Sequence, residues 1–126
     1  SYAHADAGSV IGDIERFRNL GANLWYDQDM IPGLDWDAQI ANAISGCSAV
    51  MIFLSRNSVE SVNVRNEIFF ALNLKIPIIP IYIEETELKY GLDLNLGPIQ
   101  SIRKYALPDE IYIKECLKFF DQGEFI

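Results

Sequence analysis

The sequence predicts an α/β fold built around a parallel sheet. Segments of strand length alternate with segments of helical periodicity along the 126 residues. Residues 49–54 are an uninterrupted apolar run, which is typical of a strand covered on both faces, and residues 76–83 are a second such run. Because no shift in composition divides the chain, we expect residues 1–126 to form a single domain.

The helices are predicted by apolar side chains that recur three and four residues apart. Gly21 and Gly46 follow the first two of these patterns as stop signals, and Asp35 stands where the second helix needs an N-cap. We therefore predict helices over residues 7–20, 36–46, 62–74 and 108–120.

Two shorter strands are predicted over residues 24–26 and 101–105, whereas residues 84–98 show no clear pattern. Pro80 lies in the middle of an apolar run and has no N–H to donate, so we expect it at a bulge or at an unpaired position. The complete pattern predicts a flavodoxin-like, five-stranded parallel sheet of order 2-1-3-4-5 with helices on both faces. A ligand site is expected near the carboxyl ends of strands one and three.

The first strand of that sheet is nearly absent from the sequence. Only Ser1 and Tyr2 stand where it should end, so we expect this strand to be truncated and the chain to have been excised from a longer protein. One alternative stays open, in which Phe125 and Ile126 lie near Ser1 and supply the missing strand, as in a permuted chain.

Charge and cysteine content exclude several classes of function. The net charge of -8 argues against nucleic-acid binding, and the longest apolar run is far too short to cross a membrane. Cys47 and Cys116 are far apart and the chain has a single histidine, so no metal site is expected. Two lone cysteines suit a reducing, cytoplasmic location.

Known phosphate and nucleotide motifs are also missing. A phosphoacceptor domain needs an aspartate directly after the strand 49–54, but Ser55 stands there. The turn after the first strand carries one glycine and Asp6, whose charge would repel a flavin phosphate. No GxGxxG, GxxxxGK[ST] or GxSxG pattern occurs, so neither a nucleotide cradle nor a nucleophile elbow is predicted.

Five short motifs follow one another along the sequence. They are Ser1-Tyr2, the turn at Pro32-Gly33, residues 50–55 ending in Leu-Ser, Ser61 followed by Glu67, and the Ile-Ile-Pro-Ile of residues 78–81. In this order and spacing they resemble the Toll/interleukin-1 receptor (TIR) domain family, whose opening strand ends like Ser1-Tyr2 and whose BB loop resembles Pro32-Gly33. The run Trp25-Tyr26-Asp27 is more similar to bacterial members of the family than to an animal receptor.

The resemblance implies an NAD+ glycohydrolase or cyclase. Many members of the family cleave NAD+ at the nicotinamide–ribose bond with a glutamate at the position of Glu67, so NAD+ enters as substrate and no cofactor is expected. A carboxylate there can stabilise the positive charge that develops on the ribose. The alternative reading of Glu67 is a solvated helix residue, and Asn63 stands where many active members have a tryptophan.

Further residues are candidates for substrate contact. Tyr2 and Trp36 could stack on a base, although Trp36 also begins the apolar stripe of its helix, and Asn63 could contact the substrate. Asp29 could contact ligand or cap the loop, and Gly33 sets the turn after Pro32. Ser55 and Asn57 follow a buried strand, where contact with a ribose or phosphate is possible.

The resemblance also implies partners. Homotypic TIR–TIR contacts through the BB loop, residues 27–36, would make activity depend on assembly, and a fused sensor domain would trigger it, plausibly in bacterial antiphage defence. Two alternatives stay open: a non-catalytic TIR–TIR interaction module for signalling, and a deoxyribosyltransferase-like enzyme of related fold.

Overall fold

The computed structural model describes residues 1–120, and the prediction for Phe125 and Ile126 falls outside the described residues. It shows an α/β fold around a parallel sheet with strand order β1-β2-β3. The elements are β1 (Val50–Leu54), β2 (Ile78–Tyr82), β3 (Ile102–Arg103), α1 (Ala7–Asn19), α2 (Trp36–Gly46), α3 (Arg56–Glu60), α4 (Val62–Asn73), α5 (Leu92–Leu96) and α6 (Asp109–Leu117), with short 3₁₀ turns at His4–Asp6, Asp27–Asp29 and Lys104–Ala106.

The predicted α/β class and parallel order are confirmed, and the three strands are the 3-4-5 part of the expected order. Beside β1, the Ser1 amino group donates to the Met51 carbonyl at 2.6 Å, and the Phe53 N–H donates to the Ser1 carbonyl at 3.0 Å. Ser1 therefore occupies the position that the order 2-1-3 gives to the first strand. The strand predicted over residues 24–26 is reduced to an isolated bridge at Leu24.

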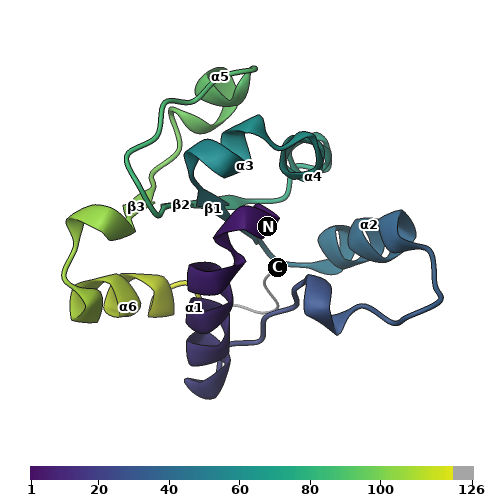
Figure 1. Ribbon diagram of the computed structural model, residues 1–126, viewed down its shortest axis with the longest axis horizontal. Coiled ribbons are helices and arrows are strands. Elements are labelled where there is room, and N and C mark those ends of the chain that lie inside the picture. Colours follow the sequence, from purple (N-terminus) through teal and green to yellow (C-terminus); the bar gives the residue numbers. More distant parts are fainter. Residues whose placement is uncertain (121–126) are drawn as a thin grey trace.

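Alternating side chains of β1 divide the core into two layers. Met51 and Phe53 face α1 and α6, whereas Val50, Ile52 and Leu54 face α2, α3, α4 and α5. Figure 1 shows α1 and α6 below the sheet and α3, α4 and α5 above it. This two-sided burial is the reason that the strand reads as a continuous apolar run.

Pro80 is accommodated where its missing N–H costs little. The Pro77 carbonyl and the Ile83 N–H both bond to β1, so the alternation along β2 turns Pro80 toward β3. The pairing with β3 begins only at Ile81, so no ladder donor is lost at Pro80. This is the unpaired position that the sequence predicted.

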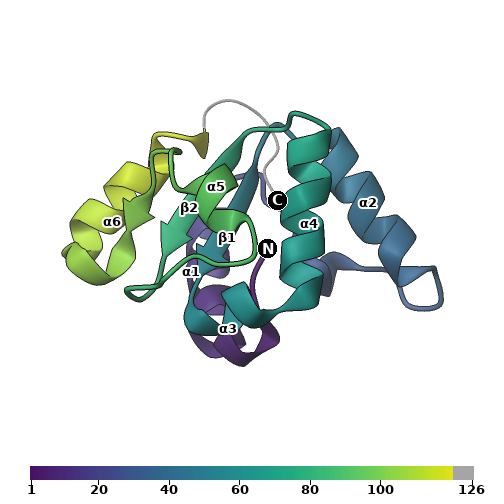
Figure 2. The same ribbon diagram turned by 90° about the horizontal axis from the view of Figure 1, so that it is seen from above.

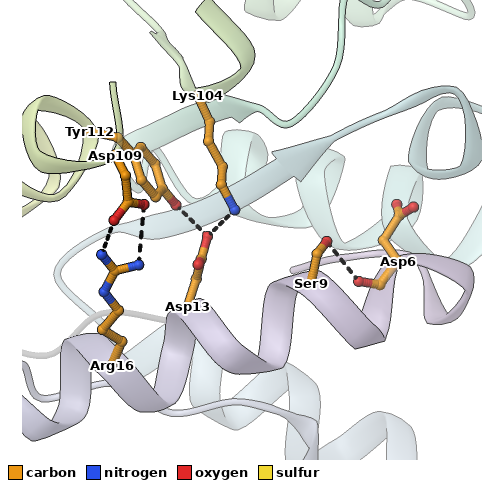
Figure 3. Close-up of polar contacts among 7 residues, drawn as sticks. All are labelled: Asp6, Ser9, Asp13, Arg16, Lys104, Asp109 and Tyr112. Carbon is orange, nitrogen blue, oxygen red and sulfur yellow. Dashed lines mark hydrogen bonds and ion pairs between the residues drawn. The ribbon is translucent and has the colours of Figure 1, made fainter. Parts of the chain in front are cut away.

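A buried polar cluster joins α1 to the carboxyl-terminal part of the chain. Asp13 is 7% exposed, and its carboxylate accepts hydrogen bonds from Lys104 Nζ at 2.6 Å and from the Tyr112 hydroxyl at 2.8 Å (Figure 3). Burial raises the pKa of the Cys116 thiol, in the same layer, to about 12. None of the described helices is long and apolar enough to span a membrane.

Candidate functional site

A cavity of about 400 Å³ lies between α2 and α4. The two helices run side by side in Figure 2, and the first residues of the chain lie close to α4. The cavity is lined by Ser1, Tyr2, His4, Trp25, Tyr26, Asp27, Trp36, Asp37, Ile40, Ala41, Ile44, Ser61, Asn63, Val64, Asn66, Glu67 and Phe70.

Helix α4 forms one wall of the cavity, and helical periodicity explains which of its side chains line it. Asn63, Asn66, Glu67 and Phe70 are spaced three and four residues apart, so they lie on one face of the helix. The Ser61 hydroxyl accepts from the Val64 N–H at 3.2 Å and caps the helix at the cavity's edge. The opposite face of α4 is buried in the core.

Glu67 is half-buried and projects a carboxylate into this cavity. Its Oε1 accepts a hydrogen bond from the Ser1 hydroxyl at 3.1 Å. Burial raises the pKa of Glu67 above its ordinary value, whereas the nearby amino terminus and the Ser1 hydrogen bond oppose that rise. The site therefore holds a carboxylate in a partly desolvated environment, where its charge acts strongly on a bound cation.

Tyr2 and Asp27 form a second polar contact in the lining. The Tyr2 hydroxyl donates to Asp27 Oδ1 at 2.6 Å. Burial, with a further contribution from this hydrogen bond, raises the pKa of Tyr2, so the phenol stays protonated and keeps donating. Behind them, the Arg18 guanidinium lies 4.6 Å from the centre of the Tyr26 ring.

The α2 wall begins with Trp36. Asp35 caps the helix as predicted, since its carboxylate accepts from the Ala38 N–H at 2.9 Å. Ile44 belongs to the core, but Trp36 is 52% exposed and lines the cavity. The apolar stripe of α2 therefore lines the cavity along its length, from the exposed Trp36 to the buried Ile44.

The structure brings together some of the predicted site residues and separates others. Tyr2, Trp36, Asn63 and Glu67 all line the cavity, whereas Asp29, Gly33, Ser55 and Asn57 do not. Asp29 accepts from the Tyr26 N–H at 3.0 Å and pairs with Arg18, which is the capping role left open by the sequence. Gly33 lies in an exposed turn with φ of 85°.

Ser55 and Asn57 instead surround Asp6. The Ser55 hydroxyl donates to Asp6 Oδ2 at 2.5 Å, and Asn57 Nδ2 donates to Asp6 Oδ1 at 2.9 Å. The Ser55 hydroxyl also accepts from the Ser58 N–H at 3.1 Å, so it begins α3. The side chains of Ser55 and Asn57 therefore both bind the Asp6 carboxylate, and neither lines the cavity.

Sequence reasoning missed several lining residues. Phe70 shares the helical face of Glu67, and this spacing could have found it. Trp25 and Tyr26 lie directly before the loop 27–36 and Asp27 is its first residue, but nothing local shows that these side chains turn toward α4. Among residues 1–120, no group of three or more metal-ligating side chains could hold a metal ion.

Comparisons with known proteins agree with this architecture. The profile of the TIR domain family matches residues 1–110, so the chain belongs to the TIR domain family. Among solved structures, the fold is similar to the TIR domain of the Toll-related Receptor TRR-2 from Hydra magnipapillata. The identity is 17%, the TM-score is 0.80, and the match covers 96% of this chain and 94% of that one. No curated protein matches the chain.

Proposed function

We propose that this TIR domain cleaves NAD+ at the nicotinamide–ribose bond and that Glu67 is its catalytic carboxylate. The observation that carries the proposal is the position of Glu67 in a 400 Å³ cavity whose walls are rich in aromatic side chains. Such a cavity suits a flat, cationic nicotinamide ring, because aromatic faces attract cations and carboxylates stabilise them.

The chemistry requires one well-placed anion. When the glycosidic bond breaks, its electron pair stays with the ring nitrogen, and nicotinamide leaves as a neutral molecule. The ribose C1′ is left with oxocarbenium character, which the Glu67 carboxylate stabilises. Water attacks C1′ and loses a proton to give ADP-ribose, or an adenine nitrogen attacks and gives a cyclic product.

Residues near Glu67 supply substrate contacts in this proposal. Trp36 and Tyr2 stack on the rings, since both line the cavity and Trp36 has a free face. Asn63 and Asn66 offer amides to the ribose hydroxyls or the phosphates, because both are exposed on the same face of α4 as Glu67.

Activity in this proposal depends on assembly through residues 27–36. Ile31 and Leu34 are 60% and 58% exposed there and stand three residues apart, so this loop offers an apolar contact to a second copy. We propose that a fused sensor domain brings copies together in the cytoplasm, and that NAD+ depletion then acts in bacterial antiphage defence. This biological role rests on the resemblance to bacterial members.

The decisive experiment measures nicotinamide release from NAD+ by the purified chain at increasing protein concentration and under crowding. We expect release to rise more steeply than in proportion to concentration. Glu67→Gln should reduce it about 100-fold or more, because the stabilising charge is lost while the side chain keeps its size. Glu15→Gln, at an exposed position on α1, is the matched control and should leave the rate unchanged.

The alternative function is a non-catalytic TIR–TIR interaction module. The exposed apolar loop favours it, and so does Asn63 at a position where many active members carry tryptophan. Assembly without nicotinamide release, or release that Glu67→Gln leaves intact, would exclude Glu67 catalysis. In the first case the interaction module would be the supported function.

A further inference from the structure

Asp6 makes contacts that its position in the chain does not explain. It stands at the N-cap of α1, where a carboxylate ordinarily accepts from the first N–H groups of its own helix, but it makes no such bond. Its backbone carbonyl accepts from the Ser9 hydroxyl of α1 at 3.3 Å. Figure 3 shows the carboxylate of Asp6 pointing away from Ser9.

The carboxylate is directed instead to the carboxyl end of β1. Each of its oxygens has one donor: the Ser55 hydroxyl at 2.5 Å and the Asn57 amide at 2.9 Å. Ser55 is 1% exposed and fixed by its place at the start of α3, so one side of this contact is rigid. Hydrogen bonds to a carboxylate are roughly twice as strong as those between neutral groups.

The segment Ser1–Asp6 is the part of the structure that these bonds hold. Ser1, Tyr2 and His4 from this segment form one wall of the cavity. Its other polar attachments are the ladder contacts of Ser1 with β1, the bond from the Ser1 hydroxyl to Glu67 and the bond from Tyr2 to Asp27. Ala3, between them, is buried in the core. The Asp6 carboxylate therefore anchors the end of the wall that lies farthest from Ser1.

We propose that Asp6 is a positioning residue for the candidate site: through Ser55 and Asn57 it holds the segment Ser1–Asp6 so that Tyr2 and His4 form the wall beside Glu67. This inference rests on the proposed function for its kinetic consequence, but its structural consequence is independent of it. It also gives Ser55 and Asn57 a role that does not require them to touch substrate.

The structural test is hydrogen exchange at the Phe53 amide, which donates to the Ser1 carbonyl. In Asp6→Ala we expect this amide to exchange about tenfold faster or more than in the parent chain, because the segment is released at its far end. The Ile83 amide, which donates to Leu54 on the other side of β1, is the internal control and should keep its protection.

The kinetic test uses NAD+ as the probe. We expect Asp6→Ala to raise KM for NAD+ about tenfold with kcat changed less than about twofold, because the wall binds substrate whereas the Glu67 carboxylate is carried by α4. Asn57→Ala should give a smaller change of the same kind, and Asp6→Asn should recover part of the loss, since its amide oxygen still accepts one bond. Asp93→Ala, at an exposed position on α5, is the control.

The outcomes separate this inference from the proposed function. Unchanged protection at Phe53 in Asp6→Ala overturns it, whether or not NAD+ is cleaved. Faster exchange at Phe53 in Asp6→Ala together with an unchanged KM for NAD+ also overturns the inference. If the parent chain releases no nicotinamide, NAD+ binding is read from the fluorescence of Trp25 and Trp36, the two tryptophans of the chain, which both line the cavity. Weaker binding in Asp6→Ala then supports the inference, and equal binding overturns it.

Discussion

Glu67 combines two properties that conflict energetically. Its carboxylate is partly buried, which raises its pKa, yet the proposed chemistry needs it ionised. Retaining a charge in such a place reduces stability, because the group loses water that the unfolded chain would give it. The Ser1 hydroxyl, 3.1 Å from Oε1, compensates only in part.

This conflict predicts the pH dependence of folding. Since the pKa of Glu67 is higher in the folded chain than in the unfolded chain, the folded state binds its proton more tightly. The contribution of Glu67 is therefore favourable at low pH and is lost as the pH rises through the raised pKa. Glu67→Gln should increase the free energy of unfolding at pH 7 by about 0.5–2 kcal/mol.

Urea unfolding of the parent and of Glu67→Gln between acidic and neutral pH checks this prediction. The difference in free energy of unfolding should grow with pH, and Glu15→Gln should show no such growth because Glu15 is exposed. A difference that shrinks toward neutral pH would contradict the raised pKa.

Helix α2 forms one wall of the cavity, and its start is fixed by Asp35. The Asp35 carboxylate accepts from the Ala38 N–H at 2.9 Å and satisfies one of the four free donors of the first turn. Asp35→Ala should lower the free energy of unfolding by about 1 kcal/mol, because that donor loses its partner.

Asp35→Ser provides the matched control, since serine caps about as well as aspartate. Thermal unfolding monitored by circular dichroism should place its stability close to that of the parent chain. Equal stability of Asp35→Ala and the parent would show that the first turn of α2 does not depend on this cap.

The exposed loop gives the molecule an apolar surface outside both core layers. Ile31 and Leu34 should contribute little to folding, since they are 60% and 58% exposed. The double substitution Ile31→Glu and Leu34→Glu should therefore change the free energy of unfolding by no more than about 0.5 kcal/mol. It should abolish concentration-dependent assembly, because charges would be buried between copies.

Sedimentation velocity over a range of concentrations measures this effect. Leu94→Glu is the control, because Leu94 is an exposed leucine of α5, 78% exposed and far from the loop in sequence. Assembly that survives the double substitution, or that Leu94→Glu disrupts equally, would remove the loop from the interface.

Much of the fold follows from local patterns. The bounds of α1 and α2 match the predicted ranges to within one residue, because apolar spacing and a glycine stop act over a few residues in both and a cap does so in α2. Within residues 1–120, two α-helices were not predicted. Helix α3 is short and begins at a capping box formed by Ser55 and Ser58. Helix α5 lies in the acidic stretch 84–98, and its Leu92 and Leu96 are buried. Such short helices depend on tertiary packing more than on periodicity.

Some residues of the candidate site could likewise be predicted from local patterns, whereas the contacts of others could not. Glu67 and Asn63 could be placed on a helix beside the third strand, since a family motif and a helical period mark them. Ser55 and Asn57 also stand where a ligand contact is expected, yet their partner is Asp6, about fifty residues earlier in the chain. No local pattern marks that pairing, because its cause is the packing of the amino-terminal segment against β1.

The amino-acid sequence was sufficient for the α/β class, the position of the main helices and the TIR domain family, because periodicity, caps and motifs are local properties. The cavity was decided only in three dimensions. Its walls come from residues 1–4, 25–27, 36–44 and 61–70, which meet because both faces of β1 are buried and the helices must pack on them. The convergence of Tyr2, Trp36 and Glu67 is therefore a product of long-range packing.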